Sequence, residues 1–163
     1  MKKFTIKISA EDLFYFSMCH TYSTFAGLFG TLFSVFCLIV LVATWGTVAL
    51  NYTFLLAVCA LLFTVWNPLT LYNKAKKRAK TAAFAEPLTY AFDDEGIEVT
   101  QGDQTAKYGW DLVFKAKQVK HAFFIYTDPI HAFILPKAQL GGKENELAAL
   151  LKEKAAGKCK GIS

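Results

Sequence analysis

The sequence predicts a membrane protein with two parts, an α-helical transmembrane hairpin and a mainly-β cytosolic domain closed by a C-terminal helix. First, no Asp, Glu, Lys or Arg occurs in the 61 residues from Leu13 to Asn73, although 19% of the chain is charged. An ordinary water-soluble domain does not contain such a run, and two membrane helices fit into it. Second, a basic cluster follows this run directly. Third, short alternating segments separated by turn formers fill most of the remaining chain.

The first nine residues alternate, with Phe4, Ile6 and Ile8 separated by polar side chains. A period of two predicts a strand over residues 1–9. Ser9 and Asp12 then stand at the spacing of a capping box, which predicts the start of a helix. We expect residues 10–23, aromatic and nearly uncharged, to form a helix that enters through the membrane interface.

The apolar run is predicted to be a two-helix transmembrane hairpin over residues 24–72. Its first span, 24–44, would extend about 31 Å, close to the thickness of the hydrocarbon core. Turn formers and interfacial aromatics at residues 45–52 indicate the reversal, and the second span follows at 53–72. Asn67-Pro68 predicts a kink near the inner end of that span.

Small residues recur at four-residue spacing on the first span, at Ala26, Gly30 and Ser34. Such a stripe allows a second helix to approach closely in lipid. The chain's own second helix is the expected partner, and a homo-oligomer that uses the same stripe is the alternative. The spans contain no ionisable Asp, Glu, Lys or Arg, which argues against a transporter or channel.

A basic juxtamembrane linker is predicted over residues 73–85. Because basic residues stay on the cytoplasmic side, both ends of the hairpin and both termini are expected in the cytoplasm. The same charges are candidate contacts for anionic lipid headgroups or for a partner, although setting topology is sufficient to explain them. The candidate residues are Lys74, Lys76, Lys77, Arg78 and Lys80.

The cytosolic domain is predicted over residues 86–156, as six strands in an antiparallel meander followed by a helix. The helix, at 143–156, places Leu147, Leu150 and Leu151 at helical spacing. Residues 157–163 form a Lys-rich tail. The predicted strands are 88–92, 97–101, 105–109, 112–120, 122–127 and 132–135.

Several short motifs in this domain resemble YcxB-like bacterial membrane proteins. They include Tyr108-Gly-Trp110-Asp-Leu, Phe123-Phe-Ile-Tyr126 and Ile134-Leu-Pro136-Lys137, and the preceding two-helix hairpin is also similar. The resemblance implies a location in the bacterial inner membrane and a pleckstrin-homology-like barrel, usually of seven strands with a C-terminal helix. It also implies structural roles for the motif residues Trp110, Pro136 and Lys137.

The seven strands that the resemblance implies exceed by one the six strands predicted after the hairpin. The alternating segment at residues 1–9 is expected on the same side of the membrane. We therefore predict that it joins the cytosolic sheet, which would make the hairpin an insertion in one domain.

Catalytic and metal-binding motifs are not found in the sequence. There is no GxSxG, HExxH or Walker pattern, and the four cysteines have no paired spacing. We expect no cofactor and no metal site. His121 and His131, with Asp128 between them, border one predicted hairpin and could lie close together, but solvated strand-end histidines are the more common case.

The sequence thus favours a non-enzymatic inner-membrane protein whose cytosolic domain binds a protein or lipid partner. Nucleic acid is not an expected partner, because the chain after residue 80 has one more acidic than basic residue. An alternative is an immunity protein that protects against a membrane-active toxin or bacteriocin through its hairpin. A lipid-modifying enzyme is the weakest alternative.

Overall fold

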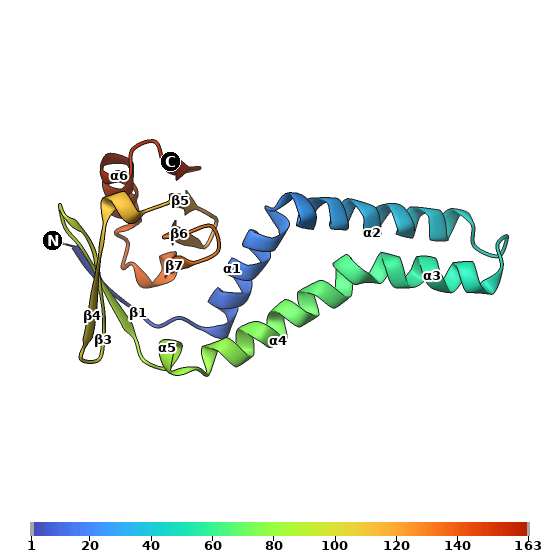
Figure 1. The fold of residues 1–163 in the computed structure, drawn as a ribbon, viewed down its shortest axis with the longest axis horizontal. Coiled ribbons are helices and arrows are strands. Elements are labelled where there is room, and N and C mark those ends of the chain that lie inside the picture. Colours follow the sequence, from blue (N-terminus) through green and yellow to red (C-terminus); the bar gives the residue numbers. More distant parts are fainter. Residues whose placement is uncertain (1, 163) are drawn as a thin grey trace. The chain divides into compact units, whose positions relative to one another are not determined.

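The computed structural model describes residues 2–162 and divides the chain into two compact units (Figure 1). One unit, which we call the β domain, contains the residues up to Asp12 and those from Ala79 onward. The other, which we call the helical hairpin, is Leu13–Arg78. The helical hairpin is therefore inserted after the first strand of the β domain.

Four helical segments make up most of the hairpin: α1 (Ala10–Tyr22), α2 (Phe25–Ala43), α3 (Leu50–Leu61) and α4 (Asn67–Ala79). The capping box that starts α1 is present, since Asp12 N–H donates to Ser9 Oγ while Ser9 N–H and O–H donate to the Asp12 carboxylate. A π-helical turn, η1 (Leu62–Trp66), joins α3 to α4, so that Leu50–Ala79 is one 30-residue helix. Two helices, Phe25–Ala43 and Leu50–Ala79, are long and apolar enough to cross a membrane.

The second helix differs from its prediction in both length and regularity. It ends at Ala79 and not at residue 72, so the basic segment predicted as part of a linker is mostly helical. Sequence reasoning ended the helix where the apolar run ended, but Lys and Arg are good helix formers and continue it. At the place where a kink is expected, Asn67-Pro68, the structure has the π-helical turn η1, which directly precedes Asn67.

The π turn compensates for the missing N–H of Pro68 by using side chains from neighbouring helices. Asn67 N–H reaches back five residues to Leu62 O, and the carbonyl of Phe63 accepts the Tyr22 hydroxyl at 2.7 Å. Ser34 Oγ donates to Cys59 O at 3.0 Å and accepts from Phe63 N–H at 3.3 Å. The Ser34 hydroxyl therefore bridges a donor and an acceptor four residues apart on the opposite helix.

Small side chains allow α2 to approach α3 and η1 closely. Gly30 and Ser34 belong to this face, as predicted, and a Cβ on Gly30 would collide with the Phe63 ring. The prediction for Ala26 is wrong, because Ala26 is exposed; Gly27 is buried one position later, where a Cβ would collide with the carbonyl of Thr21 in α1. A strict four-residue spacing drifts around a helix of 3.6 residues per turn, whereas the buried residues follow alternating steps of three and four. The buried residues are Gly27, Gly30, Ser34 and Cys37.

The β domain contains two four-stranded sheets. Strand β1 (Lys2–Ile6) pairs antiparallel with β2 (Leu88–Phe92), from Lys2 opposite Phe92 to Ile6 opposite Leu88. Strands β3 (Gly96–Gln101) and β4 (Gln104–Gly109) complete the first sheet, in the order β1-β2-β3-β4. The second sheet has the order β7-β6-β5-β8, and its strands are β5 (Lys115–Gln118), β6 (Ala122–Tyr126), β7 (Ala132–Pro136) and β8 (Cys159–Lys160).

Two differences from the predicted meander have local causes. The strand expected at 112–120 is shortened to β5, because the 3₁₀ turn η2 (Trp110–Leu112) separates the two sheets. β8, in the predicted tail, pairs parallel with β5 and was missed because two residues give no detectable alternation. The other short segments are α5 (Ala82–Ala85) before β2 and η3 (Lys137–Gln139) after β7.

The core of the β domain lies between the sheets and under the closing helix. Phe133 of β7 makes edge-to-face contacts with Tyr90 and Tyr108 of the first sheet, at ring-centroid distances of 5.6 and 5.0 Å. The C-terminal helix α6 (Glu144–Lys154) buries Leu147 and Leu151 completely. Leu150, the third predicted apolar position, is partly exposed.

Candidate functional site

The outer edge of the first sheet is formed by β4, and it is unpaired within the part of the chain that the structure describes, residues 2–162. Gln101 and Gln104 flank the two-residue turn at Gly102-Asp103, where Gly102 has a φ of 56°. The residues flanking such a turn bond to each other, so every second residue of β4 bonds to β3. The main-chain groups of Thr105, Lys107 and Gly109 consequently point away from the sheet.

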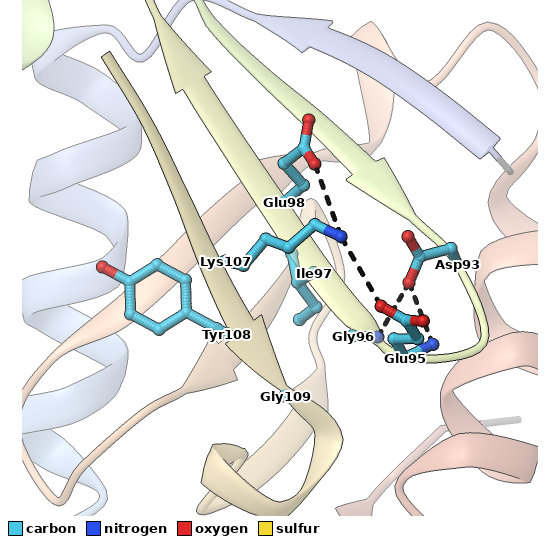
Figure 2. Close-up of a pocket in the computed structure, with 8 residues that line it drawn as sticks. All are labelled: Asp93, Glu95, Gly96, Ile97, Glu98, Lys107, Tyr108 and Gly109. Atoms are coloured by element: carbon cyan, nitrogen blue, oxygen red, sulfur yellow. Dashed lines mark hydrogen bonds and ion pairs between the residues drawn. The ribbon is translucent and has the colours of Figure 1, made fainter.

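A cavity of about 200 Å³ lies at the Gly109 end of this edge (Figure 2). Lys107 Nζ lies 3.6 Å from a carboxylate oxygen of Glu95 and 4.0 Å from one of Glu98. Tyr108 points to the opposite face of the sheet. The lining residues are Asp93, Glu95, Gly96, Ile97, Glu98, Lys107, Tyr108 and Gly109.

The turn beside this cavity is held by one carboxylate oxygen of Asp93. Asp93 Oδ1 accepts the N–H groups of Glu95 at 3.0 Å and Gly96 at 2.8 Å. A Cβ on Gly96 would collide with the carbonyl oxygen of Tyr108, so the close approach of β3 and β4 requires glycine at this position. Asp93 is therefore a structural residue of the site.

An acidic group lies next to the end of the exposed edge. Gly109 has no side chain, and the position that a Cβ would take is already occupied by Oδ1 of Asp111. The side chain of Glu95 is 85% exposed nearby. Two cations lie here, Lys107 and Lys158, whose Nζ donates to Asp111 O at 3.0 Å. The carboxylates Asp93, Glu95, Glu98 and Asp111 outnumber them, so this end of the edge carries a net negative charge.

A second cavity, of about 430 Å³, lies on the other face of the sheet near the β3–β4 turn. Val99 faces the same side as the buried Ile97, and Ala106 the same side as Tyr108, which packs on Phe133. Ala106 is nevertheless exposed and Val99 only half-buried. Apolar surface of the first sheet therefore stays uncovered beside β4. The lining residues are Leu88, Val99, Gln101, Gln104, Thr105, Ala106 and Tyr108.

The motif residues Trp110, Pro136 and Lys137 lie at the corners of the β domain. Trp110 Nε1–H donates to Asp93 O at 3.0 Å, and its ring stacks on Phe92, so it fixes the turn beside the first cavity. Pro136 ends β7. Lys137 N–H donates to His121 O, and Lys137 Nζ lies 5.4 Å from the centre of the Phe123 ring.

The basic cluster is exposed on α4 and just beyond its end. Lys74, Lys76, Lys77, Arg78 and Lys80 are all solvent-accessible, and Lys76 Nζ lies 4.6 Å above the Tyr72 ring. The helix distributes these charges around its last turns instead of along an extended linker. Ala75, among them, is buried.

His121 and His131, which the sequence allowed to lie close together, are separated by the length of the β6–β7 hairpin. His121 precedes β6 and His131 precedes β7, and these antiparallel strands place them at opposite ends. The turn at His131 is held by Asp128, which accepts N–H bonds from Ile130 and His131 and pairs with the His131 ring at 2.7 Å. No group of three or more potential metal ligands occurs among residues 2–162.

The exposed edge of β4 is not predicted as a site by the sequence. The sequence does contain the residues that border this edge. They are the acidic run Asp93–Glu95, Glu98 in the next strand, and Trp110-Asp111 after β4. Locating the edge required knowing that the meander breaks at Trp110, which strand periodicity does not reveal.

Comparison with protein families gives one match, between residues 92–153 and the family model described as YcxB-like protein. The matched residues run from the end of β2 to within α6 and include Trp110, Pro136 and Lys137. The predicted resemblance is confirmed over this segment. Comparisons with curated proteins and with solved structures give no match.

Proposed function

Since residues 92–153 belong to the YcxB-like family, we propose that this chain is a bacterial two-pass inner-membrane protein whose pleckstrin-homology-like cytosolic domain binds a protein partner. In this proposal the helical hairpin is an anchor, the β domain is the binding module, and the protein is not an enzyme. Two sheets closed by the C-terminal helix α6 support the pleckstrin-homology-like assignment.

The proposal that the hairpin is a membrane anchor rests on the exposure of apolar side chains, which differs between the two units. Large apolar side chains of α2 point outward, among them Phe29, Leu32 and Ile39 at 61–62% exposure, while the buried residues of that helix are small or weakly polar. The β domain has the reverse pattern, with most of its large apolar side chains inside and Leu112, Phe114 and Ile130 exposed. Apolar outer faces are stable in lipid and not in water.

The lengths and the charges support a crossing with both ends inside. Helix α2 has 19 residues, or about 28 Å, which is close to the hydrocarbon thickness. Leu50–Ala79 has 30 residues, of which the last six include four basic ones. The basic end would extend beyond the apolar layer into the cytoplasm, on the same side as the β domain.

The charge of the candidate site favours a protein over a lipid partner. The exposed edge of β4 is bordered by Glu95, Glu98 and Asp111, which would repel the anionic headgroups of a bacterial membrane. An unpaired strand edge with uncovered apolar surface beside it is a typical binding surface for a polypeptide. Protection against a toxin through the hairpin gains no specific support from the described residues.

Reporter fusions test the anchor. Green fluorescent protein fused after the last residue is expected to fluoresce, and alkaline phosphatase inserted at Gly46, between α2 and α3, is expected to be active. Both fusions should sediment with the membrane fraction and resist extraction by carbonate. Active phosphatase at the C-terminal end, or a protein released by carbonate, would contradict the two-pass arrangement.

A further inference from the structure

The exposed edge of β4 has main-chain groups that point outward. Apolar surface lies beside it on one face of the sheet, and acidic side chains lie at its Gly109 end on the other face. We propose that this edge accepts an extended segment of the protein partner as a fifth strand of the first sheet. The segment would carry an apolar residue and a basic residue three positions apart. This inference rests on the proposed function only in assigning partner binding to the β domain.

Main-chain pairing is possible along most of β4. The outward N–H and C=O groups belong to Thr105, Lys107 and Gly109, three alternate residues that set the two-residue repeat of an added strand. Thr105 and Lys107 are exposed, and β4 contains no proline. Addition of a strand to such an edge supplies main-chain hydrogen bonds whatever the sequence of the partner.

Lysines commonly protect strand edges from pairing, but Lys107 is turned away from this one. Its Nζ lies between Glu95 and Glu98, and Glu98 belongs to β3, on the inner side of β4 (Figure 2). The side chain therefore folds back over the sheet. As a result, Lys107 does not cover the outer edge of β4.

The cavity on the core-facing side of the sheet selects an apolar residue. A residue of the added strand opposite Ala106 would point to the same face as Ala106. There it would pack on Ala106 and reach toward Val99 of the next strand, which is only partly buried in the chain alone. Burying this apolar surface favours an aliphatic side chain at that position.

The acidic end of the edge selects a basic residue. A residue opposite Gly109 would point to the other face. Gly109 has no side chain to block it there, and Asp111 Oδ1 lies next to the strand. Glu95 is the exposed carboxylate on the same side. Ala106 and Gly109 are three residues apart and face opposite sides, so the apolar and basic residues of the partner are also three apart, in an order set by strand direction.

A matched pair of variants tests the pairing directly. Thr105→Pro removes an outward N–H that takes no part in the β3–β4 ladder, and edge strands tolerate proline at such positions. Thr105→Val keeps the N–H, and both variants lose the contact between the Thr105 and Thr100 hydroxyls. Random heptapeptides displayed on phage are selected against the full-length protein in lipid nanodiscs. Equal melting temperatures of the two variants confirm that the sheet is intact.

Selected peptides are expected to contain an aliphatic residue and a Lys or Arg three positions apart. They should bind Thr105→Val like the native protein and Thr105→Pro about tenfold more weakly or worse. Bound peptide should slow hydrogen exchange at the amides of Thr105, Lys107 and Gly109. In a second selection, against Glu95→Lys, the preference for a basic residue should disappear.

Equal affinity of the peptides for Thr105→Pro and Thr105→Val would overturn the proposal, as would selected peptides without the spacing. This result can be separated from a failure of the membrane anchor. The reporter fusions measure whether the hairpin crosses the membrane, whereas the peptide measurements depend only on the β domain of the intact protein.

Discussion

Trp110 connects the break between the two sheets with the candidate site. Its indole N–H holds the carbonyl of Asp93, and Asp93 in turn holds the turn that carries Glu95. The main-chain carbonyls of Trp110 and Asp111 accept Lys158 Nζ, at 3.3 and 3.0 Å. The side chains of Trp110, Asp93 and Lys158 together therefore fix the corner of the β domain and the acidic end of the β4 edge.

Trp110→Phe is expected to lower the free energy of unfolding by about 1 kcal/mol, because the ring is kept while one hydrogen bond is lost. Thermal unfolding of the full-length protein in detergent, followed by circular dichroism of the sheets, measures this effect. Trp45→Phe, at a side chain that is 70% exposed, is the matched control and should leave the transition unchanged. A Trp110→Phe protein as stable as the control would contradict the role assigned to the indole N–H.

Asp128 is expected to make part of the stability dependent on acid pH. The N–H bonds from Ile130 and then His131 favour the ionised carboxylate and hold the pKa of Asp128 below its ordinary value. A lowered pKa in the folded state stabilises at pH values above the unfolded pKa, and this contribution is lost as the pH falls through the folded pKa. Asp128→Asn, which keeps an oxygen acceptor but cannot titrate, should therefore lose less stability than the native protein between about pH 5 and pH 3 in urea titrations. Equal losses would contradict this linkage.

At the scale of single residues, the sequence predicts the roles that depend only on a residue's neighbours along the chain. The capping box at Ser9 and Asp12 depends on four consecutive residues, and the structure contains it. Asp111 could not be recognised as part of a site, because its position beside Gly109 depends on the 3₁₀ turn.

Among the elements, the π turn η1 is a local irregularity that a neighbouring helix stabilises. Ser34 supplies both a donor and an acceptor to the main chain of the opposite helix, at Cys59 and Phe63. In lipid no water is available to replace these bonds. The pairing of α2 with the second helix therefore depends on one hydroxyl group as well as on small side chains.

Ser34→Ala is expected to destabilise the hairpin by about 0.6 to 1.7 kcal/mol, the range of hydrogen bonds between membrane helices. Unfolding in mixed micelles with increasing mole fraction of dodecyl sulfate measures the loss. Thr31→Val is the control, because the Thr31 hydroxyl bonds within its own helix, to Gly27 O. If the two substitutions had equal effects, the bridge across the helices would not contribute.

Strand β1 should be required for the stability of the β domain. Ile6 is fully buried opposite Leu88, so Ile6→Ala should cost about 2 to 5 kcal/mol. Hydrogen exchange of the β2 amides in the full-length protein should accelerate accordingly. The exposed neighbour Thr5, replaced by Ala, provides the control. Unchanged exchange in Ile6→Ala would show that the first strand is dispensable.

At the scale of elements, period and turn chemistry predicted most strands and the closing helix within a few residues. The pairing of β1 with β2 was predicted from a strand count that the family resemblance supplied, not from periodicity. The division into two sheets depends on Trp110 and on β8, a two-residue strand whose partner is more than forty residues away. Such non-local pairings leave no periodic signal in the sequence.

For the whole molecule, the distribution of charge separates the roles of the two units. Basic residues gather at the end of α4, whereas the β4 edge is acidic. In the proposed arrangement the first group faces lipid headgroups and the second faces a partner. The overall charge of +5 hides this separation.

In the proposed arrangement, replacing Lys76, Lys77 and Arg78 together with Gln is expected to invert the topology of a substantial fraction of molecules, because the end of the hairpin assigned to the cytoplasm loses most of its positive charge. Increased phosphatase activity of a C-terminal fusion measures the inverted fraction. The control replaces three exposed lysines far from the spans in sequence, Lys120, Lys143 and Lys152, and should leave that activity unchanged. An unchanged topology in both variants would leave the basic cluster without an orienting role.

The insertion of the hairpin after β1 also sets an order of events during synthesis. Ile6 leaves the ribosome 82 residues before its partner Leu88, and at about 5–20 residues per second this delay is roughly 4 to 16 seconds. Throughout that interval the first strand has no sheet to join, while both apolar helices are synthesised. The first sheet can therefore form only on a chain whose hairpin has already been made, and in the proposed arrangement this gives the helices time to enter the bilayer before the β domain folds.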